Sequence, residues 1–172
     1  MERHKIQEAE MAALLAHHGQ VYDIFPYEKH LRDVIEVIVR FFKDDETLII
    51  SGWLHDAIED TYLTYSKIKH TFGFEVAEIV FAVTDELGRN RQERHDKTYP
   101  KIVLCGWKAV AVKLADRIAN VEHSLNNNHA LFNMYRKEYP EFSKALYFPD
   151  PNLQELWDYI HCLMQNVRDI PE

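Results

Sequence analysis

The stretch WLHDAIEDT, residues 53–61, places four ionisable side chains inside an otherwise apolar run. On a helix, residues four positions apart share a face, so His55 lies beside Glu59 and Asp56 lies beside Asp60. The apolar residues between these pairs need a core to pack against, which draws part of the polar face towards the interior. Buried carboxylates and imidazoles are costly unless they are paired or bind a cation. The stretch therefore predicts a core helix that carries a cation site.

Two other segments also place a polar side chain in apolar helical surroundings. His30 opens the amphipathic segment PYEKHLRDVIEV at 26–37, and Asp116 lies in AVKLADRIAN at 111–120, with Asn120 four residues further on. Two histidines and two aspartates from three helices give a mixed set of nitrogen and oxygen donors. Such a set suits Mn²⁺, Fe²⁺ or Zn²⁺ better than Ca²⁺ or Mg²⁺, which prefer oxygen alone. The four residues are candidate metal ligands.

Each of these features also has a purely structural explanation. A single histidine such as His30 is more often a helix cap or a surface residue than a ligand, and Asp116 has Lys113 and Arg117 as potential ion-pair partners. The segment 55–60, taken alone, also fits a solvated helix face. The occurrence of all three features together in apolar helices is much harder to explain by chance, so it favours the metal site.

The rest of the chain is dominated by helical periodicity, and no segment alternates convincingly with a period of two. The nearest to a strand is ETLIIS at 46–51, but its neighbours favour a helix. The helices are expected at residues 2–17, 28–42, 47–60, 66–72, 74–86, 107–125, 130–146 and 151–167. We therefore predict an all-α bundle in a single domain that spans residues 1–172.

Local signals refine two of these boundaries and leave one segment open. Thr64 is a candidate N-cap for the short helix 66–72, and Gly73 is a candidate stop signal at its end. The segment LGRNRQERHDKTYP at 87–100 is polar and basic at its centre. It predicts either an exposed helix or a mobile loop.

The composition restricts the class of protein. The 172 residues are 47% hydrophobic and 28% charged, and the formal net charge of −8 disfavours general nucleic-acid binding. Cys105 and Cys162 form no CxxC pair, so a disulfide framework or a cysteine zinc site is not expected. No apolar run reaches the roughly 18 residues of a membrane span, and the first residues lack the apolar core of a signal peptide. We expect a cytoplasmic protein that binds neither nucleic acid nor a membrane.

Taken in order, these motifs resemble those of the HD-domain metal-dependent phosphohydrolases. More narrowly, they resemble the hydrolase domain of the RelA/SpoT-homologue family, in particular the stand-alone small alarmone hydrolases. The stretches that carry the resemblance are HHGQ (17–20), PYEKH (26–30), HDAIEDT (55–61), FGFEVAEIVFAVTDE (72–86) and KLADRIANV (113–121). The resemblance implies an HD-type helical bundle with its core at about residues 12–125 and C-terminal helices within 130–167.

By this resemblance, the protein would remove pyrophosphate from the 3′ position of an alarmone-type nucleotide, (p)ppGpp or (pp)pApp. One Mn²⁺ would be bound by His30, His55, Asp56 and Asp116. Glu59 and Asp60 would form the catalytic pair beside the metal, where they can orient or deprotonate a water molecule. Because two neighbouring carboxylates do not titrate independently, one of them is expected to have a raised pKa.

The resemblance also implies contacts with the substrate. Asn120 would contact the nucleotide at its ribose. Outside the stretches that carry the resemblance, Tyr135 in the segment 130–147 is a candidate to close over the nucleotide. Arg91 and Arg94, together with Lys97, would neutralise the pyrophosphate. Without the family, a solvated charged helix would be the simpler interpretation of these basic residues.

One departure from the family pattern concerns the nucleotide base. The pattern runs H-x-G-Q-x-Arg, with the arginine packed on guanine, whereas HHGQVY places Tyr22 at that position. A tyrosine can stack on a purine, but it lacks the donors and the charge of a guanidinium. Tyr22 is therefore a candidate base contact, and both an adenine alarmone and a guanine alarmone are candidate substrates.

Two other functions stay open. Other HD phosphohydrolases, such as 5′-nucleotidases and dNTP triphosphohydrolases, share the metal site, and a non-catalytic nucleotide-binding HD protein would share the fold. Loss of the ED pair would favour the non-catalytic protein, but this chain keeps both Glu59 and Asp60. The oligomeric state is not predicted by the sequence.

Overall fold

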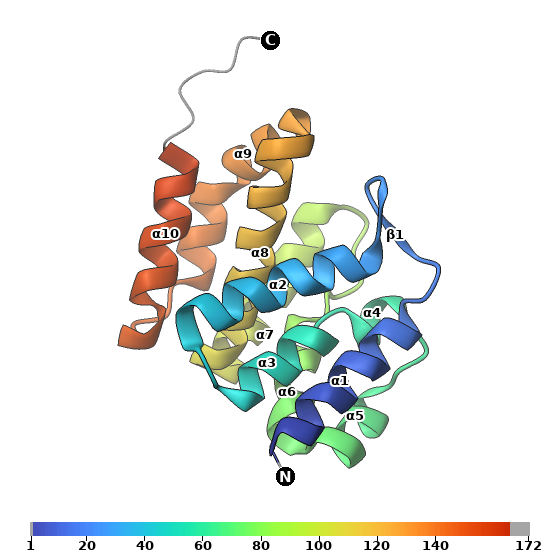
Figure 1. Cartoon of the computed structure of the whole chain (residues 1–172). Coiled ribbons are helices and arrows are strands. Elements are labelled where there is room, and N and C mark those ends of the chain that lie inside the picture. Colours follow the sequence, from blue (N-terminus) through green and yellow to red (C-terminus); the bar gives the residue numbers. More distant parts are fainter. Residues whose placement is uncertain (1, 166–172) are drawn as a thin grey trace.

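Helices make up nearly all of the regular secondary structure of the described chain (Figure 1). The computed structural model describes residues 2–165. Its elements are α1 (Glu2–Ala16), β1 (Val21–Tyr22), β2 (Phe25–Pro26), α2 (Tyr27–Phe42), α3 (Glu46–Leu54), α4 (Ala57–Asp60), α5 (Tyr65–Phe72), α6 (Phe74–Val83), α7 (Arg91–Cys105), α8 (Trp107–Asn127), α9 (His129–Leu146), the 3₁₀ helix η1 (Pro151–Leu153) and α10 (Gln154–Gln165). The prediction of an all-α bundle is confirmed.

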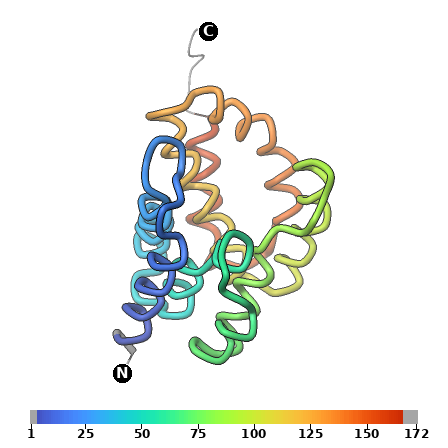
Figure 2. Tube along the Cα trace, turned by 90° about the vertical axis from the view of Figure 1, so that its right-hand side faces the viewer, coloured from blue at the N-terminus to red at the C-terminus, as the bar shows by residue number. Residues whose placement is uncertain are grey.

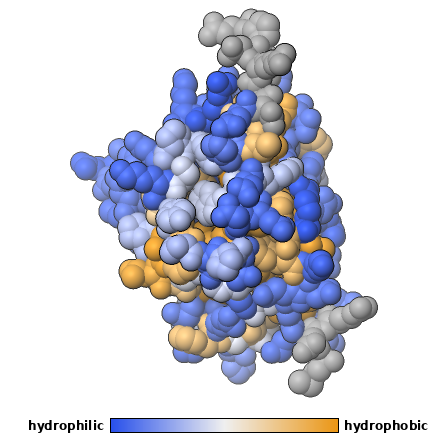
Figure 3. Space-filling view, turned by 90° about the vertical axis from the view of Figure 1, so that its left-hand side faces the viewer, coloured by the Kyte–Doolittle hydropathy of each residue, from blue (hydrophilic) through white to orange (hydrophobic). Residues whose placement is uncertain are grey.

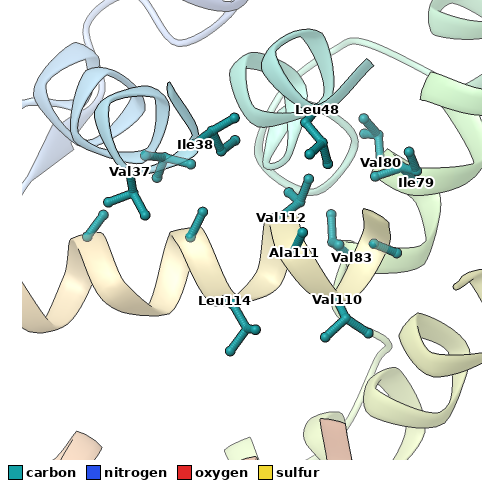
Figure 4. Packing of buried hydrophobic residues seen from close by; sticks show 14 of the residues in the cluster. Val37, Ile38, Leu48, Ile79, Val80, Val83, Val110, Ala111, Val112 and Leu114 are labelled. Atoms are coloured by element: carbon teal, nitrogen blue, oxygen red, sulfur yellow. The ribbon is translucent and has the colours of Figure 1, made fainter. Parts of the chain in front are cut away.

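The helix α8 is central to the bundle, because it packs against α2, α3, α6, α7, α9 and α10. Figure 4 shows Val37 of α2, Leu48 of α3 and Val80 of α6 on one side of α8, whereas Leu114 and Val110 of α8 point to the opposite side. All five side chains are buried. A helix that is apolar on opposite faces lies inside a protein, so the polar residues of α8 are drawn inwards with it.

The C-terminal helices complete the bundle. α9 runs from the end of α8 towards α7, and α10 packs along α8 (Figure 2). Phe132 and Phe142 of α9 and Leu156 and Ile160 of α10 are buried in the same hydrophobic cluster as the core of α8. The expected C-terminal helix 151–167 begins as η1 and continues as α10, and its last two residues lie outside the described part of the chain.

The helix-end signals read from the sequence are confirmed at α5. The side chain of Thr64 accepts a hydrogen bond from the backbone N–H of Lys67, which satisfies a free donor of the first turn. Gly73 ends the helix with a φ of 99°, a left-handed value that glycine adopts without the steric penalty of a side chain.

The segment 87–100 is helical from Arg91 onwards, where α7 begins, but this helix is only partly exposed because His95, Thr98 and Tyr99 are buried. The Asn90 side chain caps this helix by accepting from the backbone N–H of Glu93. Gly106, with a φ of 108°, is the only residue between α7 and α8. Its left-handed backbone lets one helix stop and the next begin at once.

Two expectations about local structure are wrong. The helix expected at 47–60 is two helices, α3 and α4, because Asp56 leaves helical geometry with a φ of −97° and a ψ of 0°. The sequence also missed an antiparallel hairpin in which Val21 pairs with Pro26 and Tyr22 with Phe25. Strands of two residues are too short to show a period of two, so the sequence held no signal for them.

The outer surface is predominantly hydrophilic on the face shown in Figure 3, with hydrophobic residues in a band across its middle. Between residues 2 and 165, no helix has the combination of length and apolar character that crossing a bilayer requires.

Candidate active site

Two histidines and two aspartates converge where α2, α8 and the end of α3 meet. His30 belongs to α2, His55 and Asp56 to the turn after α3, and Asp116 to α8. The Nε2 atom of His55 lies 2.9 Å from Oδ2 of Asp56 and 3.2 Å from Nε2 of His30. Nε2 of His30 lies 3.5 Å from Oδ1 of Asp116. The structure thus brings together the four candidate metal ligands.

The donor atoms of His30, His55 and Asp56 all lie within 4.8 Å of one another, a spacing that fits one bound ion. Asp116 approaches both histidines but lies outside this set of three. Two atoms that each lie about 2.1 Å from the same metal are at most about 4.2 Å apart. The separations of the donor atoms include 3.7 Å between His30 and Asp56 and 4.0 Å between His55 and Asp116. Both imidazoles are buried, and two nitrogen and two oxygen donors suit a transition metal. The cluster therefore has the chemistry and dimensions of a divalent metal site.

The backbone sets the orientation of the His55 ring. Its Nδ1 lies 2.8 Å from the carbonyl oxygen of Gly52, which can only accept a hydrogen bond. Nδ1 therefore donates, and Nε2 is the atom that faces the cluster. Burial opposes the charged imidazole, but the carboxylates of Asp56 and Asp116 outweigh burial and raise the pKa of His55 to about 9. A metal at Nε2 would displace that proton.

The helix break at Asp56 lets its carboxylate reach across to α2. The hydroxyl of Tyr27 donates to Oδ2 of Asp56, and the ring of His17 stacks on Tyr27 with 4.6 Å between ring centroids. Burial alone would raise the pKa of Asp56, but the nearby imidazoles of His55 and His30 hold it well below its usual value. Asp56 is therefore ionised, as a metal ligand must be.

Asp116 is held by neighbours on its own helix. Lys113 Nζ lies 3.1 Å from Oδ2, and the amide nitrogen of Asn120 donates to Oδ1 at 2.5 Å and to the backbone oxygen at 2.9 Å. Burial would raise the pKa of Asp116, but Lys113 and the imidazoles of His55 and His30 together outweigh burial and lower the pKa. The ion pair with Lys113, considered from the sequence as an alternative to a metal, exists alongside the cluster.

The candidate catalytic pair lies on α4, directly after the metal cluster in the chain. Oε2 of Glu59 accepts a hydrogen bond from the backbone N–H of Asp85 at 2.9 Å. Partial desolvation and the neighbouring carboxylates raise the pKa of Glu59, and desolvation and the Asp56 carboxylate raise that of Asp60. Both side chains are solvent-exposed. An accessible carboxylate with a raised pKa is suited to accept a proton from water.

Two candidate substrate contacts, Tyr22 and Asn120, form a hydrogen bond with each other. The Tyr22 hydroxyl donates to Oδ1 of Asn120 at 2.7 Å. Its ring stacks on His30 with 4.7 Å between centroids and 28° between planes. Burial raises the pKa of Tyr22, so the hydroxyl keeps its proton and acts as the donor. The structure places Tyr22 against His30, one of the candidate metal ligands.

The other candidate contacts lie where α7 faces α9. Arg91 pairs with Glu138, with 2.6 Å between Nε and Oε1, and its guanidinium lies 5.9 Å from the ring centroid of Tyr135. Arg117 of α8 contacts the same two residues, at 3.0 Å from Glu138 and 4.7 Å from the Tyr135 ring. Arg94 lies one turn further along α7 and is half-buried.

Several residues of this neighbourhood were not identified as site residues from the sequence. Glu138 links Arg91 of α7 to Arg117 of α8, and Tyr27 supports Asp56 from α2. These contacts join residues far apart in the chain, so no local spacing pattern could reveal them. Lys113 is different, because its position three residues before Asp116 on a helix is a readable signal.

Comparisons with known proteins agree with this geometry. An HD domain family model matches residues 9–141. Guanosine-3′,5′-bis(diphosphate) 3′-pyrophosphohydrolase of Haemophilus influenzae is 38% identical over 118 residues, which are 64% of this chain and 17% of that protein. The pyrophosphohydrolase MESH1 of Drosophila melanogaster is 30% identical over 97 residues, 56% of this chain and 54% of that protein. The matched part of this chain thus spans 17% of the length of the first relative and 54% of the length of the second.

A solved structure shares the fold over most of the chain. It is described as a metazoan ortholog of SpoT that hydrolyzes ppGpp, and it superposes with a TM-score of 0.78. The match covers 95% of this chain and 97% of that one at 24% sequence identity, a level that speaks for the fold alone. The HD-type fold expected from the sequence is confirmed. With its matched family model and its cluster of two histidines and two aspartates, the chain belongs to the HD domain family.

Proposed function

We propose that this protein is a Mn²⁺-dependent 3′-pyrophosphohydrolase that acts on an alarmone-type nucleotide, (pp)pApp or (p)ppGpp. One observation carries the proposal: a cluster of two buried histidines and two partly buried aspartates is followed, on the next short helix, by two accessible carboxylates. The names of the relatives from Haemophilus influenzae and Drosophila melanogaster support 3′-pyrophosphohydrolysis as the reaction.

The candidate site residues have different roles in the proposed reaction. His30, His55, Asp56 and Asp116 would hold the ion, which when bound supplies Lewis acidity and lowers the pKa of water. Glu59 or Asp60 accepts a proton as the water oxygen joins the phosphorus attached to the 3′ oxygen. The bond between that phosphorus and the 3′ oxygen breaks, the oxygen takes up a proton, and pyrophosphate leaves. Arg91 and Arg94 neutralise its charge.

A substrate panel tests this proposal. We expect the protein loaded with Mn²⁺ to release pyrophosphate from ppApp or ppGpp and leave ADP or GDP, and to lose this activity in a chelator. The products, identified by chromatography and mass spectrometry, separate the proposal from its alternatives. A dNTP triphosphohydrolase would release triphosphate, and a 5′-nucleotidase would release phosphate from the 5′ side. Absence of any 3′ release would contradict the alarmone function.

Arg91 should contribute to substrate binding more than to turnover. Arg91→Met removes the guanidinium but keeps an apolar stem of similar length, and Glu138 retains its pair with Arg117. A hydrogen bond to a charged group contributes about 1.5–3 kcal/mol, so KM should rise roughly 10- to 100-fold while kcat stays near the original value. Steady-state kinetics with the substrate identified in the panel provides the measurement.

The matched control for this variant is Arg89→Met. Arg89 lies just before α7, and its largely exposed side chain pairs with Glu93. We expect its KM to match that of the unmodified protein. Equal increases in KM for both variants would mean that Arg91 acts through the overall charge of the segment and makes no specific contact.

A further inference from the structure

The position of Tyr22 in the structure suggests a role other than stacking on a nucleotide base. Its hydroxyl donates to Asn120, and the amide nitrogen of Asn120 donates to both Oδ1 and the backbone oxygen of Asp116. The three residues form a chain of hydrogen bonds that ends on a candidate metal ligand. Because the amide oxygen of Asn120 is directed to Tyr22, its amide nitrogen is directed to Asp116.

The ring of Tyr22 contacts a second candidate ligand. It stacks on His30 at 4.7 Å, and this is the imidazole whose Nδ1 is buried without a hydrogen-bond partner in the described structure. A metal-binding histidine is normally oriented by a partner on its other ring nitrogen. For His30, the stacked ring of Tyr22 supplies a contact that fixes the plane of the imidazole.

The hairpin that carries Tyr22 is itself attached to α8. Nε2 of His123 lies 3.3 Å from Oδ2 of Asp23, and the His123 ring lies 4.7 Å from the Tyr22 ring. Asn120 and His123 are three residues apart on α8, so they share a face. Asp23 takes a left-handed φ of 55°, which turns the chain at this point. Two neighbouring contacts therefore hold Tyr22 against the helix that carries Asp116.

We propose that Tyr22 is a positioning residue of the metal centre, which holds Asp116 through Asn120 and the His30 ring by stacking. The proposal rests on the metal site of the proposed function, and it gives the tyrosine at the family's arginine position a role in metal binding. The predicted consequence is that metal affinity depends on the Tyr22 hydroxyl.

Tyr22→Phe tests this role, because it removes the hydroxyl and keeps the ring. The metal-free protein is titrated with Mn²⁺, and the loss of the electron paramagnetic resonance signal of free Mn²⁺ reports binding. Loss of an outer partner of a metal ligand typically costs 10- to 100-fold in affinity. For this more distant hydrogen bond we expect a dissociation constant about tenfold higher. Thermal unfolding of the metal-free variant shows whether it is folded.

A double-mutant cycle with Asn120→Ala separates this chain of hydrogen bonds from a general loss of structure. If the hydroxyl acts through Asn120, Tyr22→Phe lowers the affinity in the original protein but has little further effect in Asn120→Ala. The control Tyr147→Phe, at a largely exposed tyrosine, should bind Mn²⁺ normally. Equal losses in both backgrounds would overturn the proposed coupling.

The remaining outcomes distinguish this inference from the proposed function. An unmodified protein that binds no Mn²⁺ contradicts the metal centre itself. Unchanged Mn²⁺ affinity in Tyr22→Phe overturns only the role of Tyr22. If the same variant instead alters the preference between adenine and guanine nucleotides, the residue contacts the base, as the sequence pattern suggested.

Discussion

Replacing His55 with alanine should abolish both metal binding and hydrolysis. His55 lies at the centre of the cluster, with its Nε2 within 4.0 Å of donor atoms from His30, Asp56 and Asp116. Its loss leaves one imidazole and removes the positive charge of His55, which lowers the pKa of the partly buried carboxylates of Asp56 and Asp116. We expect no detectable Mn²⁺ binding by calorimetry and hydrolysis at the rate of the uncatalysed reaction.

A conservative variant shows whether the loss of metal binding in His55→Ala results from misfolding. His55→Asn keeps a polar atom near Nδ1 that can still donate to the Gly52 carbonyl, but it lacks Nε2. It should fold, with the helical circular dichroism spectrum of the original protein, and still bind no metal. His70→Ala, at an exposed histidine of α5, should bind and hydrolyse normally. Metal binding retained in both His55 variants would show that the cluster is not the metal site.

Glu59→Gln should lower kcat by about 10²- to 10⁴-fold, which is the usual contribution of a general base. The two side chains have nearly the same shape, and the amide oxygen of glutamine can still accept from the Asp85 N–H. Metal affinity and KM should therefore stay close to their original values. Steady-state kinetics and a Mn²⁺ titration on the same sample separate these quantities.

The dependence of kcat on pH provides a second test of Glu59. Partial desolvation and nearby carboxylates raise the pKa of Glu59, so protonation removes the base at a higher pH than for an ordinary glutamate. Activity should fall as the pH falls through this raised pKa, and the Gln variant should lack that limb. Glu155→Gln, at an exposed site of α10, is the matched control. An unchanged kcat in Glu59→Gln would transfer the role of base to Asp60.

The helices and the candidate metal ligands could be predicted from the sequence because both show a pattern of local spacing. His30, His55, Asp56 and Asp116 each stand out as polar residues among apolar helical neighbours. Burial of those neighbours forces the polar side chains inwards, and a shared interior brings them together. The sequence pattern thus contained the main constraint on this part of the site.

The rest of the site could not be predicted, because it depends on contacts between distant segments and on backbone geometry. No glycine or proline lies next to Asp56 to signal the break between α3 and α4. The carboxylate of Asp56 also accepts a hydrogen bond from the hydroxyl of Tyr27, which belongs to another helix. Arg91 was indicated as a pyrophosphate contact, yet its bond to Glu138 joins residues 47 positions apart. The role of Tyr22 depends on a hairpin too short to leave a period in the sequence.

The one-residue junction at Gly106 sets the rotational phase of α8 relative to α7. Asp116 lies ten residues beyond it, and successive residues of an α-helix are turned by about 100°. One residue inserted between Gly106 and Asp116 would swing the carboxylate away from the histidines while leaving Arg91 in place. The distance along the chain from this junction to Asp116 is thus as much a part of the site as the side chains, and it admits no small insertion or deletion.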